Sequence, residues 1–214
     1  MAENAKALLN VSYRSLRRWI GILGVLLPWL LMLRTWQIEP SISHYYYTAA
    51  SPIFTGILIA FGLLLLTYQG YEKTEKEKVS DNTITNLAGF FALITAILPT
   101  SCYDGQLHTF CHFDSTLNTI HLLSAGAFLI LVGAMSYFKF PLGGTKKAFY
   151  KTMGIIVWAS IAFMLIYFAL EEKIGDNFPQ GVLVGEIIGV SAFGISWLVK
   201  GKPGEMKLFG GSKT

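Results

Sequence analysis

The sequence predicts an all-α, polytopic membrane protein: one integral membrane domain over residues 1–214, built as a six-transmembrane-helix bundle with both termini cytoplasmic. Composition is the first reason, because 53% of the 214 residues are hydrophobic and only 14% are charged, against about 25% charged in a soluble domain. The second reason is patterning. The apolar residues gather in runs close to the roughly 20 residues that cross a hydrocarbon core.

Six apolar runs define the expected helices in chain order. The basic segment 1–17 is compatible with a short helix on the membrane surface, and the first span follows it with Pro28 as a kink. That span is longer than the core of a signal peptide and lacks a small-residue cleavage site, so we expect it to be retained. The six spans are predicted at about residues 19–37, 52–69, 83–99, 117–138, 149–170 and 181–199.

The distribution of positive charge predicts the orientation. Of the 17 Lys and Arg residues, all but Arg34 and Lys173 fall in the N-terminal segment, two loops (71–82 and 139–151) and the C-terminal tail. Loops rich in Lys and Arg stay in the cytoplasm, which places both termini there. We therefore expect a multi-pass protein of the cell inner (cytoplasmic) membrane. Membrane lipids are the expected partners, and no motif for binding nucleic acid is present.

The outward-facing loops hold the residues that can do chemistry. With this orientation, all four histidines and both cysteines lie in these loops or just below them. Cys102 and Cys111 in an oxidising compartment predict a disulfide. Binding of a metal by Cys111 and His112 is the alternative.

Two ionisable residues, His121 and Glu186, lie well inside their predicted spans. Asp114, Asn118 and His121 share one stripe of the fourth helix, although Asp114 also suits a helix cap. His121 is either a functional group or a neutral histidine hydrogen-bonded to another helix. Glu186 flanks a small-residue ridge that allows close helix approach and makes an oligomer a further hypothesis. We predict that His121 and Glu186 share a polar pocket. The ridge consists of Gly181, Gly185 and Gly189.

The first outward loop, EPSISHYYYTAASP, is the expected lid of this pocket. Tyrosines at a membrane boundary are typical of an aromatic belt, but this loop also carries hydroxyl and imidazole groups. Arg34 lies just below it and is expected to pair with Glu186 or a lipid phosphate. The predicted ligand-binding residues are Arg34, Ser41, Ser43, His44, Tyr46, Asn118, His121 and Glu186.

Zinc is the alternative cofactor hypothesis, since no cofactor is certain. Enough donors lie on one side of the membrane, but no HExxH motif is present. Two functions therefore stay open: binding of a lipid headgroup or small ligand without chemistry, which we favour, and zinc-dependent hydrolysis of lipid amide or ester bonds, with Glu186 or Asp114 activating water. The predicted metal ligands are His108, His112, His121, Asp114 and Glu186.

Several short motifs resemble a known group. The segments SISHYYYT, FTGILIAFGLLLLTYQG, LPT, IHLLSAGAF and GEIIGVSAFGISWLVKG resemble a group of uncharacterised bacterial six-span membrane proteins. They are more distantly similar to the DRAM-like family, which includes autophagy modulators and a Golgi protein needed for GPI-anchor lipid remodelling. In that family a histidine before small residues opens span 4 and a glutamate lies in the last span, which correspond to His121 and Glu186. The resemblance implies that the first outer loop and the starts of spans 4 and 6 belong to one site.

The cysteine pair and the segment HTFCH are not part of the family pattern. Zinc-dependent ceramidases and adiponectin-type receptors offer only a chemical analogy.

Overall fold

The computed structural model describes residues 2–70, 73, 77–102, 114–175 and 177–202. Within these ranges the chain is all-helical and forms no strand. The principal helices are α1 (Ala2–Thr35), α2 (Ser51–Leu66), α3 (Asp81–Ile97), α4 (Ser115–Ala134), α6 (Lys147–Ile174) and α7 (Gly181–Lys200). Shorter elements are the 3₁₀ helix η1 (Ser43–Tyr47), a π-helical turn (Met135–Lys139) and α5 (Phe140–Gly143).

The length and apolar composition of the helices indicate a membrane protein. Among the described residues, four helical stretches are long and apolar enough to cross a bilayer: Arg14–Thr35, Ser115–Leu142, Lys147–Glu171 and Gly181–Lys200. The apolar helix Ser51–Leu66 is shorter. The bundle also turns many large apolar side chains outward, which suits lipid rather than water. They include Trp29, Leu33, Leu63, Phe90, Leu123, Leu165 and Ile188.

Local sequence signals explain where the helices begin. The Ser80 hydroxyl accepts a hydrogen bond from the Thr83 backbone N–H at 3.0 Å and caps α3. Asp114 Oδ1 does the same for α4, accepting from the N–H groups of Thr116 and Leu117 at 2.8 and 3.1 Å. These bonds satisfy backbone donors that the first turn of a helix leaves unpaired. The structural explanation of Asp114 is therefore confirmed.

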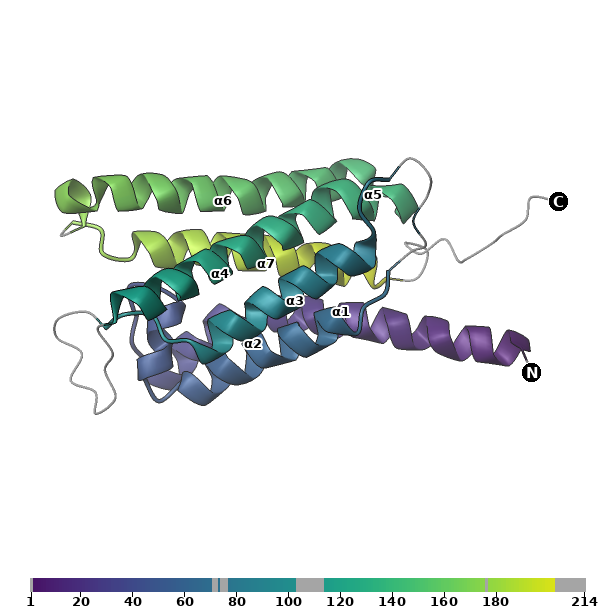
Figure 1. Ribbon diagram of the computed structural model, residues 1–214, viewed down its shortest axis with the longest axis horizontal. Helices are drawn as coiled ribbons and strands as arrows, with labels where there is room; N and C mark the ends of the chain where they lie inside the picture. Colours follow the sequence, from purple (N-terminus) through teal and green to yellow (C-terminus); the bar gives the residue numbers. More distant parts are fainter. Residues whose placement is uncertain (1, 71–72, 74–76, 103–113, 176, 203–214) are drawn as a thin grey trace.

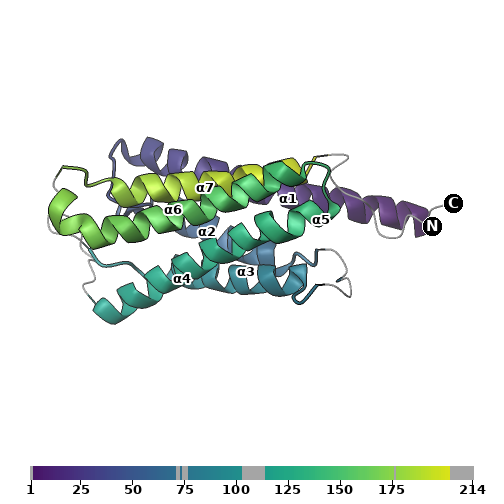
Figure 2. The ribbon, with the colours of Figure 1, turned by 90° about the horizontal axis from the view of Figure 1, so that it is seen from above.

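The beginning of α1 differs from the sequence prediction. Instead of a separate surface helix followed by a span, one helix of 34 residues runs from Ala2 to Thr35. Strong helix formers with no glycine or proline precede Gly21, so nothing local breaks the helix there. Pro28 lies inside this helix. The N-terminal half of α1 projects beyond the other helices in both views (Figures 1 and 2).

The six principal helices form a closed ring. In the part of the chain that the structure describes, α1 packs on α2, α2 on α3, α3 on α4, α4 on α6, α6 on α7, and α7 back on α1. The end of the bundle where α1, α3 and α6 finish and α2, α4 and α7 begin is called the outer end. The start of α1 and the finish of α7 lie toward the opposite end (Figure 1).

Glycines let several of these helices touch. A Cβ added to Gly194 of α7 would lie 2.7 Å from the Val25 backbone nitrogen, and one added to Gly133 of α4 would lie 2.6 Å from Trp158 of α6. The predicted glycine ridge of α7 packs within the chain, because its three glycines lie against Tyr167, Met164 and Ser160 of α6. The ridge therefore makes a contact within the chain, and an oligomer stays a prediction.

Three cationic side chains are buried inside the bundle, at the end away from the outer end. The sequence had predicted them to be exposed charges in loops and terminal segments. Arg17 donates to the Tyr68 hydroxyl at 2.7 Å. Lys139 pairs with Glu77 at 2.5 Å and with Asp81 at 3.6 Å. Lys200 donates to the Phe140 carbonyl at 2.8 Å and lies over aromatic rings. Such partners offset the cost of taking a cation out of water.

Candidate functional site: a polar cavity at the outer end

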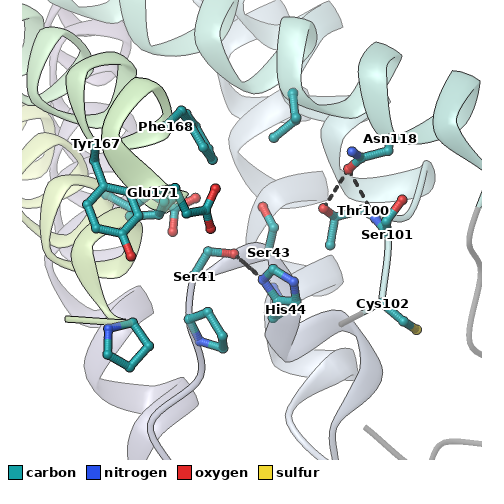
Figure 3. Close-up of a pocket in the computed structure, with 15 residues that line it drawn as sticks. Ser41, Ser43, His44, Thr100, Ser101, Cys102, Asn118, Tyr167, Phe168 and Glu171 are labelled. Carbon is teal, nitrogen blue, oxygen red and sulfur yellow. Dashed lines mark hydrogen bonds between the residues drawn. The ribbon is translucent and has the colours of Figure 1, made fainter. Parts of the chain in front are cut away.

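A cavity of about 250 Å³ opens at the outer end of the bundle. The link between α1 and α2 (residues 36–50, containing η1), the residues between α3 and α4, and the helices α4, α6 and α7 contribute to its wall. Figure 3 shows the α6 residues on one side, Asn118 and the segment 100–102 on the other, and Ser41, Ser43 and His44 between them. The site therefore joins elements from most of the chain.

The α1–α2 link is tied to α7 by two hydrogen bonds. The Leu183 backbone N–H donates to the Pro40 carbonyl at 3.0 Å. The Ile42 backbone N–H donates to Glu186 Oε2 at 2.5 Å. Glu186 therefore has a defined structural partner, and it also lines the cavity. These bonds hold η1 across the outer end of the helix ring.

His121 connects three elements and is completely buried. Its Nδ1 lies 2.7 Å from the Leu98 carbonyl oxygen at the end of α3, and its Nε2 lies 2.7 Å from Ser43 Oγ in η1. A carbonyl oxygen only accepts, so Nδ1 donates. In a neutral imidazole Nε2 then accepts, and the Ser43 hydroxyl donates to it. The result is a serine–histidine pair oriented by a backbone carbonyl.

A second serine–histidine pair lies within the link itself. Ser41 Oγ is 2.7 Å from His44 Nδ1 and also accepts from the His44 backbone N–H at 3.3 Å (Figure 3). Burial, chiefly, and the nearby His121 lower the pKa of His44 to about 4, against the opposing effect of a backbone hydrogen bond to Ser101. His44 is therefore a neutral imidazole at physiological pH.

Asn118 has an oriented carboxamide. Its Oδ1 accepts from the Thr100 hydroxyl at 2.9 Å and from the Ser101 backbone N–H at 3.0 Å (Figure 3). Because both acceptor contacts hold the oxygen, the side-chain NH₂ group is the part left to donate. Asn118 lines the cavity and can therefore offer a ligand two N–H donors.

The structure brings most of the predicted ligand-binding residues together. Ser41, Ser43, His44, Asn118 and Glu186 line the cavity, and His121 lies directly behind Ser43. Because His121 itself does not line the cavity, a pocket shared by His121 and Glu186 stays a prediction.

Two further predicted residues, like His121, do not line this cavity. Arg34 has an exposed side chain at the end of α1. Tyr46 packs edge-on against the rings of Tyr47 and Phe54. Arg34 is separated from the lining residues of the link by a turn at Trp36, which has a left-handed backbone (φ 54°).

A smaller apolar cavity adjoins the polar one inside the helix ring. It measures about 40 Å³ and is lined mostly by apolar side chains, among them Leu27, Phe54, Leu58, Phe128 and Val190. Ser43 and Glu186 line both cavities. A polar compartment and an apolar one therefore meet at these two side chains.

The polar cavity lies where α4 and α6 separate. The two helices approach closely at Gly133 and Trp158, and they diverge toward the outer end in both views (Figures 1 and 2). Leu122 and Phe168 line the cavity from α4 and α6 and are 43% and 44% exposed. We therefore take the mouth of the cavity to lie between these two apolar side chains, which also belong to the outer surface of the bundle.

Sequence reasoning missed several residues of the wall. Glu171 could have been found as an acidic residue at the outer end of a span, but the small and aromatic residues carry no such signal. The missed residues are Pro40, Thr100, Ser101, Leu122, Tyr167, Phe168, Glu171, Pro179 and Val182, and Cys102 was predicted only as a disulfide partner.

The predicted zinc ligands do not form a cluster among the described residues. Asp114 caps α4 and both ring nitrogens of His121 have hydrogen-bond partners. His108 and His112 lie outside the described residues. Cys111 does too, so its predicted disulfide with Cys102 stays a prediction. Cys102 itself is buried and is not a free thiol.

No protein-family model matches the chain, and neither a curated protein nor a solved structure is significantly similar to it. The resemblance to the six-span and DRAM-like families therefore stays a prediction.

Proposed function

We propose that this protein binds a membrane lipid at the outer end of its bundle, with the headgroup in the polar cavity and the start of an acyl chain in the apolar one. The observation that carries the proposal is the meeting of the two cavities at Ser43 and Glu186. A lipid has the same division, because its polar headgroup is joined directly to an apolar acyl chain.

The mouth between α4 and α6 supports a lipid rather than a water-soluble ligand. Leu122 and Phe168 flank it with exposed apolar surface. A lipid can enter sideways between the two helices, keeping its chains in hydrocarbon while its headgroup reaches Asn118 and Ser41. A soluble ligand gains nothing from an apolar rim.

The polar wall favours an uncharged or cationic headgroup. The lining residues include the carboxyl groups of Glu171 and Glu186 together with hydroxyl, amide and imidazole groups, and none of the described lining residues is Lys or Arg. Phosphate sites in proteins usually supply such cations. Since Arg34 is not part of the wall, a headgroup rich in hydroxyl or amine groups suits the cavity best.

The proposal includes a six-span arrangement in the cytoplasmic membrane. With 16 and 17 residues, α2 and α3 reach about 24–26 Å, a little less than the roughly 30 Å hydrocarbon core, which bilayers accommodate by local thinning. They belong to the same closed ring as the four longer spans and turn Leu63, Leu87 and Phe90 outward. The Lys and Arg residues near the two termini and in the loops at the same end support a cytoplasmic position for both termini.

The test is native mass spectrometry of the full chain purified in mild detergent. We expect about one lipid per chain to be retained. Leu122→Trp fills the mouth and should lower the retained fraction by about tenfold, the effect of roughly 1.4 kcal/mol. Leu123→Trp is the matched control, because Leu123 is 69% exposed on the same helix and does not line the cavity. Equal retention in the two variants, or no retained lipid in the unmodified protein, contradicts the proposal.

A further inference from the structure

The Ser43–His121 pair has the geometry of an activated nucleophile. The hydroxyl lies 2.7 Å from Nε2, and the other ring nitrogen is held 2.7 Å from the Leu98 carbonyl. A nucleophile, a base within hydrogen-bond reach and a third group that orients the base are the parts required for covalent catalysis by serine. Here a backbone carbonyl takes the place that a carboxylate occupies in the common triad.

The position of Ser43 is equally informative. Its side chain lines both the polar and the apolar cavity, whereas His121 behind it is completely buried. The substrate side of the pair is therefore reachable and the base is shielded from water. In a lipid bound as proposed above, the bond that joins the acyl chain to the headgroup falls at the junction of the two cavities.

We propose that Ser43 and His121 hydrolyse a carboxylic ester of a membrane lipid without a metal ion, a step that rests on the proposed lipid site. Ser43 Oγ attacks the ester carbonyl carbon while its proton passes to His121 Nε2. The C–O bond to the headgroup alcohol then breaks, and the alcohol leaves with that proton. Water attacks the acyl-serine, His121 takes the water proton, and the fatty acid departs as Ser43 regains a proton.

A fluorophosphonate carrying an alkyl chain tests the nucleophile directly. Ser43 Oγ should form a bond to phosphorus as the P–F bond breaks and fluoride leaves. Peptide mass spectrometry of the detergent-purified full chain should find one adduct, on Ser43. The adduct should disappear in Ser43→Ala. Ser160→Ala is the matched control, because Ser160 is also buried but lines neither cavity and bonds to the Val157 carbonyl.

The role of His121 is tested by rates. His121→Gln should slow both labelling and hydrolysis of a 4-nitrophenyl ester of a medium-chain acid by about 10²-fold or more, the usual contribution of a general base. Ser43→Ala should lower ester hydrolysis by about 10³-fold or more. Thermal unfolding of each variant in the same detergent shows whether the fold is retained. Absence of an adduct on Ser43, or an unchanged rate in a folded His121→Gln, overturns the proposal.

Lipid retention separates failure of this inference from failure of the proposed function. Lipid retention by native mass spectrometry and labelling by the fluorophosphonate are therefore both measured on the unmodified protein. Lipid bound to a protein that does not react with the fluorophosphonate overturns the catalytic pair alone. Loss of all lipid from the unmodified protein overturns the lipid site, and the hydrolysis step with it.

Discussion

At the scale of single residues, the outer end is organised by polar side chains that bond to partners far away in the sequence. His121 contacts Leu98 and Ser43, which lie 23 and 78 positions away in sequence. Glu186 accepts from Ile42 across 144 positions. Because an unpaired buried polar group is costly, these bonds hold the link between α1 and α2 in one place. The same bonds align Ser43 for chemistry.

His44 should make stability depend on pH. Its pKa of about 4 in the folded protein lies below the ordinary 6.5, so the unfolded chain binds the extra proton first as pH falls. The contribution to stability is complete above about pH 6.5 and is lost as pH falls toward 4. The thermal unfolding midpoint of the detergent-purified protein, measured from pH 7.5 to pH 4.5, should therefore fall.

The matched variant for this pH dependence is His44→Gln. Glutamine keeps hydrogen-bonding capacity but does not titrate, so the decline over that interval should be smaller than in the unmodified protein. Other groups titrating below pH 5 contribute equally to both proteins and cancel in the difference. Identical pH profiles would show that His44 carries no such linkage.

At the scale of elements, close helix contacts decide where the bundle is tight and where it opens. α1 and α7 meet backbone to backbone, since a Cβ on Gly194 would lie 2.7 Å from the Val25 nitrogen and 2.8 Å from the Gly21 carbonyl oxygen. The contact at Gly133 brings α4 near α6 away from the outer end, and their divergence from there makes room for the cavity (Figure 2).

Replacing glycine by alanine, which adds one methyl group, should affect the free energy of unfolding differently at two helical positions. Gly194→Ala must push α1 away from α7 and should lower the free energy of unfolding by about 1–3 kcal/mol, as overpacking does. Gly126→Ala in α4 meets nothing within 4 Å and should be neutral or stabilising by up to about 1 kcal/mol through helix propensity. Thermal unfolding in detergent measures both. A Gly194→Ala protein as stable as Gly126→Ala would contradict the tight α1–α7 contact.

At the scale of the whole molecule, a closed ring of helices carries its polar cavity at one end and its buried cations at the other. Arg17, Lys139 and Lys200 are buried among partners from several helices. Around this interior many large apolar side chains are exposed on the surface of the bundle, which suits contact with lipid. The asymmetry of charge is the basis for the proposed orientation.

Single cysteines test that orientation in the full chain. Asn177 and Lys146 are both exposed and lie in connections at opposite ends of α6. A membrane-impermeant maleimide should label Asn177→Cys in intact cells and Lys146→Cys only after permeabilisation, because the proposed topology places Lys146 in the cytoplasm. The unmodified protein serves as the blank for Cys102 and Cys111. Labelling of Lys146→Cys in intact cells would invert the proposed topology.

Composition and apolar periodicity by themselves determined the all-α membrane class, and the expected helix positions agree closely with those found from α2 onward. These properties are local, since each helix must satisfy its own backbone and present an apolar face wherever it lies. The separate surface helix predicted in residues 1–17 was not found, because no glycine or proline there interrupts α1.

Only the tertiary structure decided which polar groups meet. Ser43, His121 and Glu186 come from three elements, and the Ser43–His121 contact joins residues 78 positions apart in sequence. Arg34, although nearer to Ser43 in sequence, lies outside the cavity. The glycine ridge predicted a close helix contact but could not show that α6 is the partner. A helical pattern specifies one face of one helix, whereas a site requires faces from several helices to converge, and that depends on how the whole ring packs.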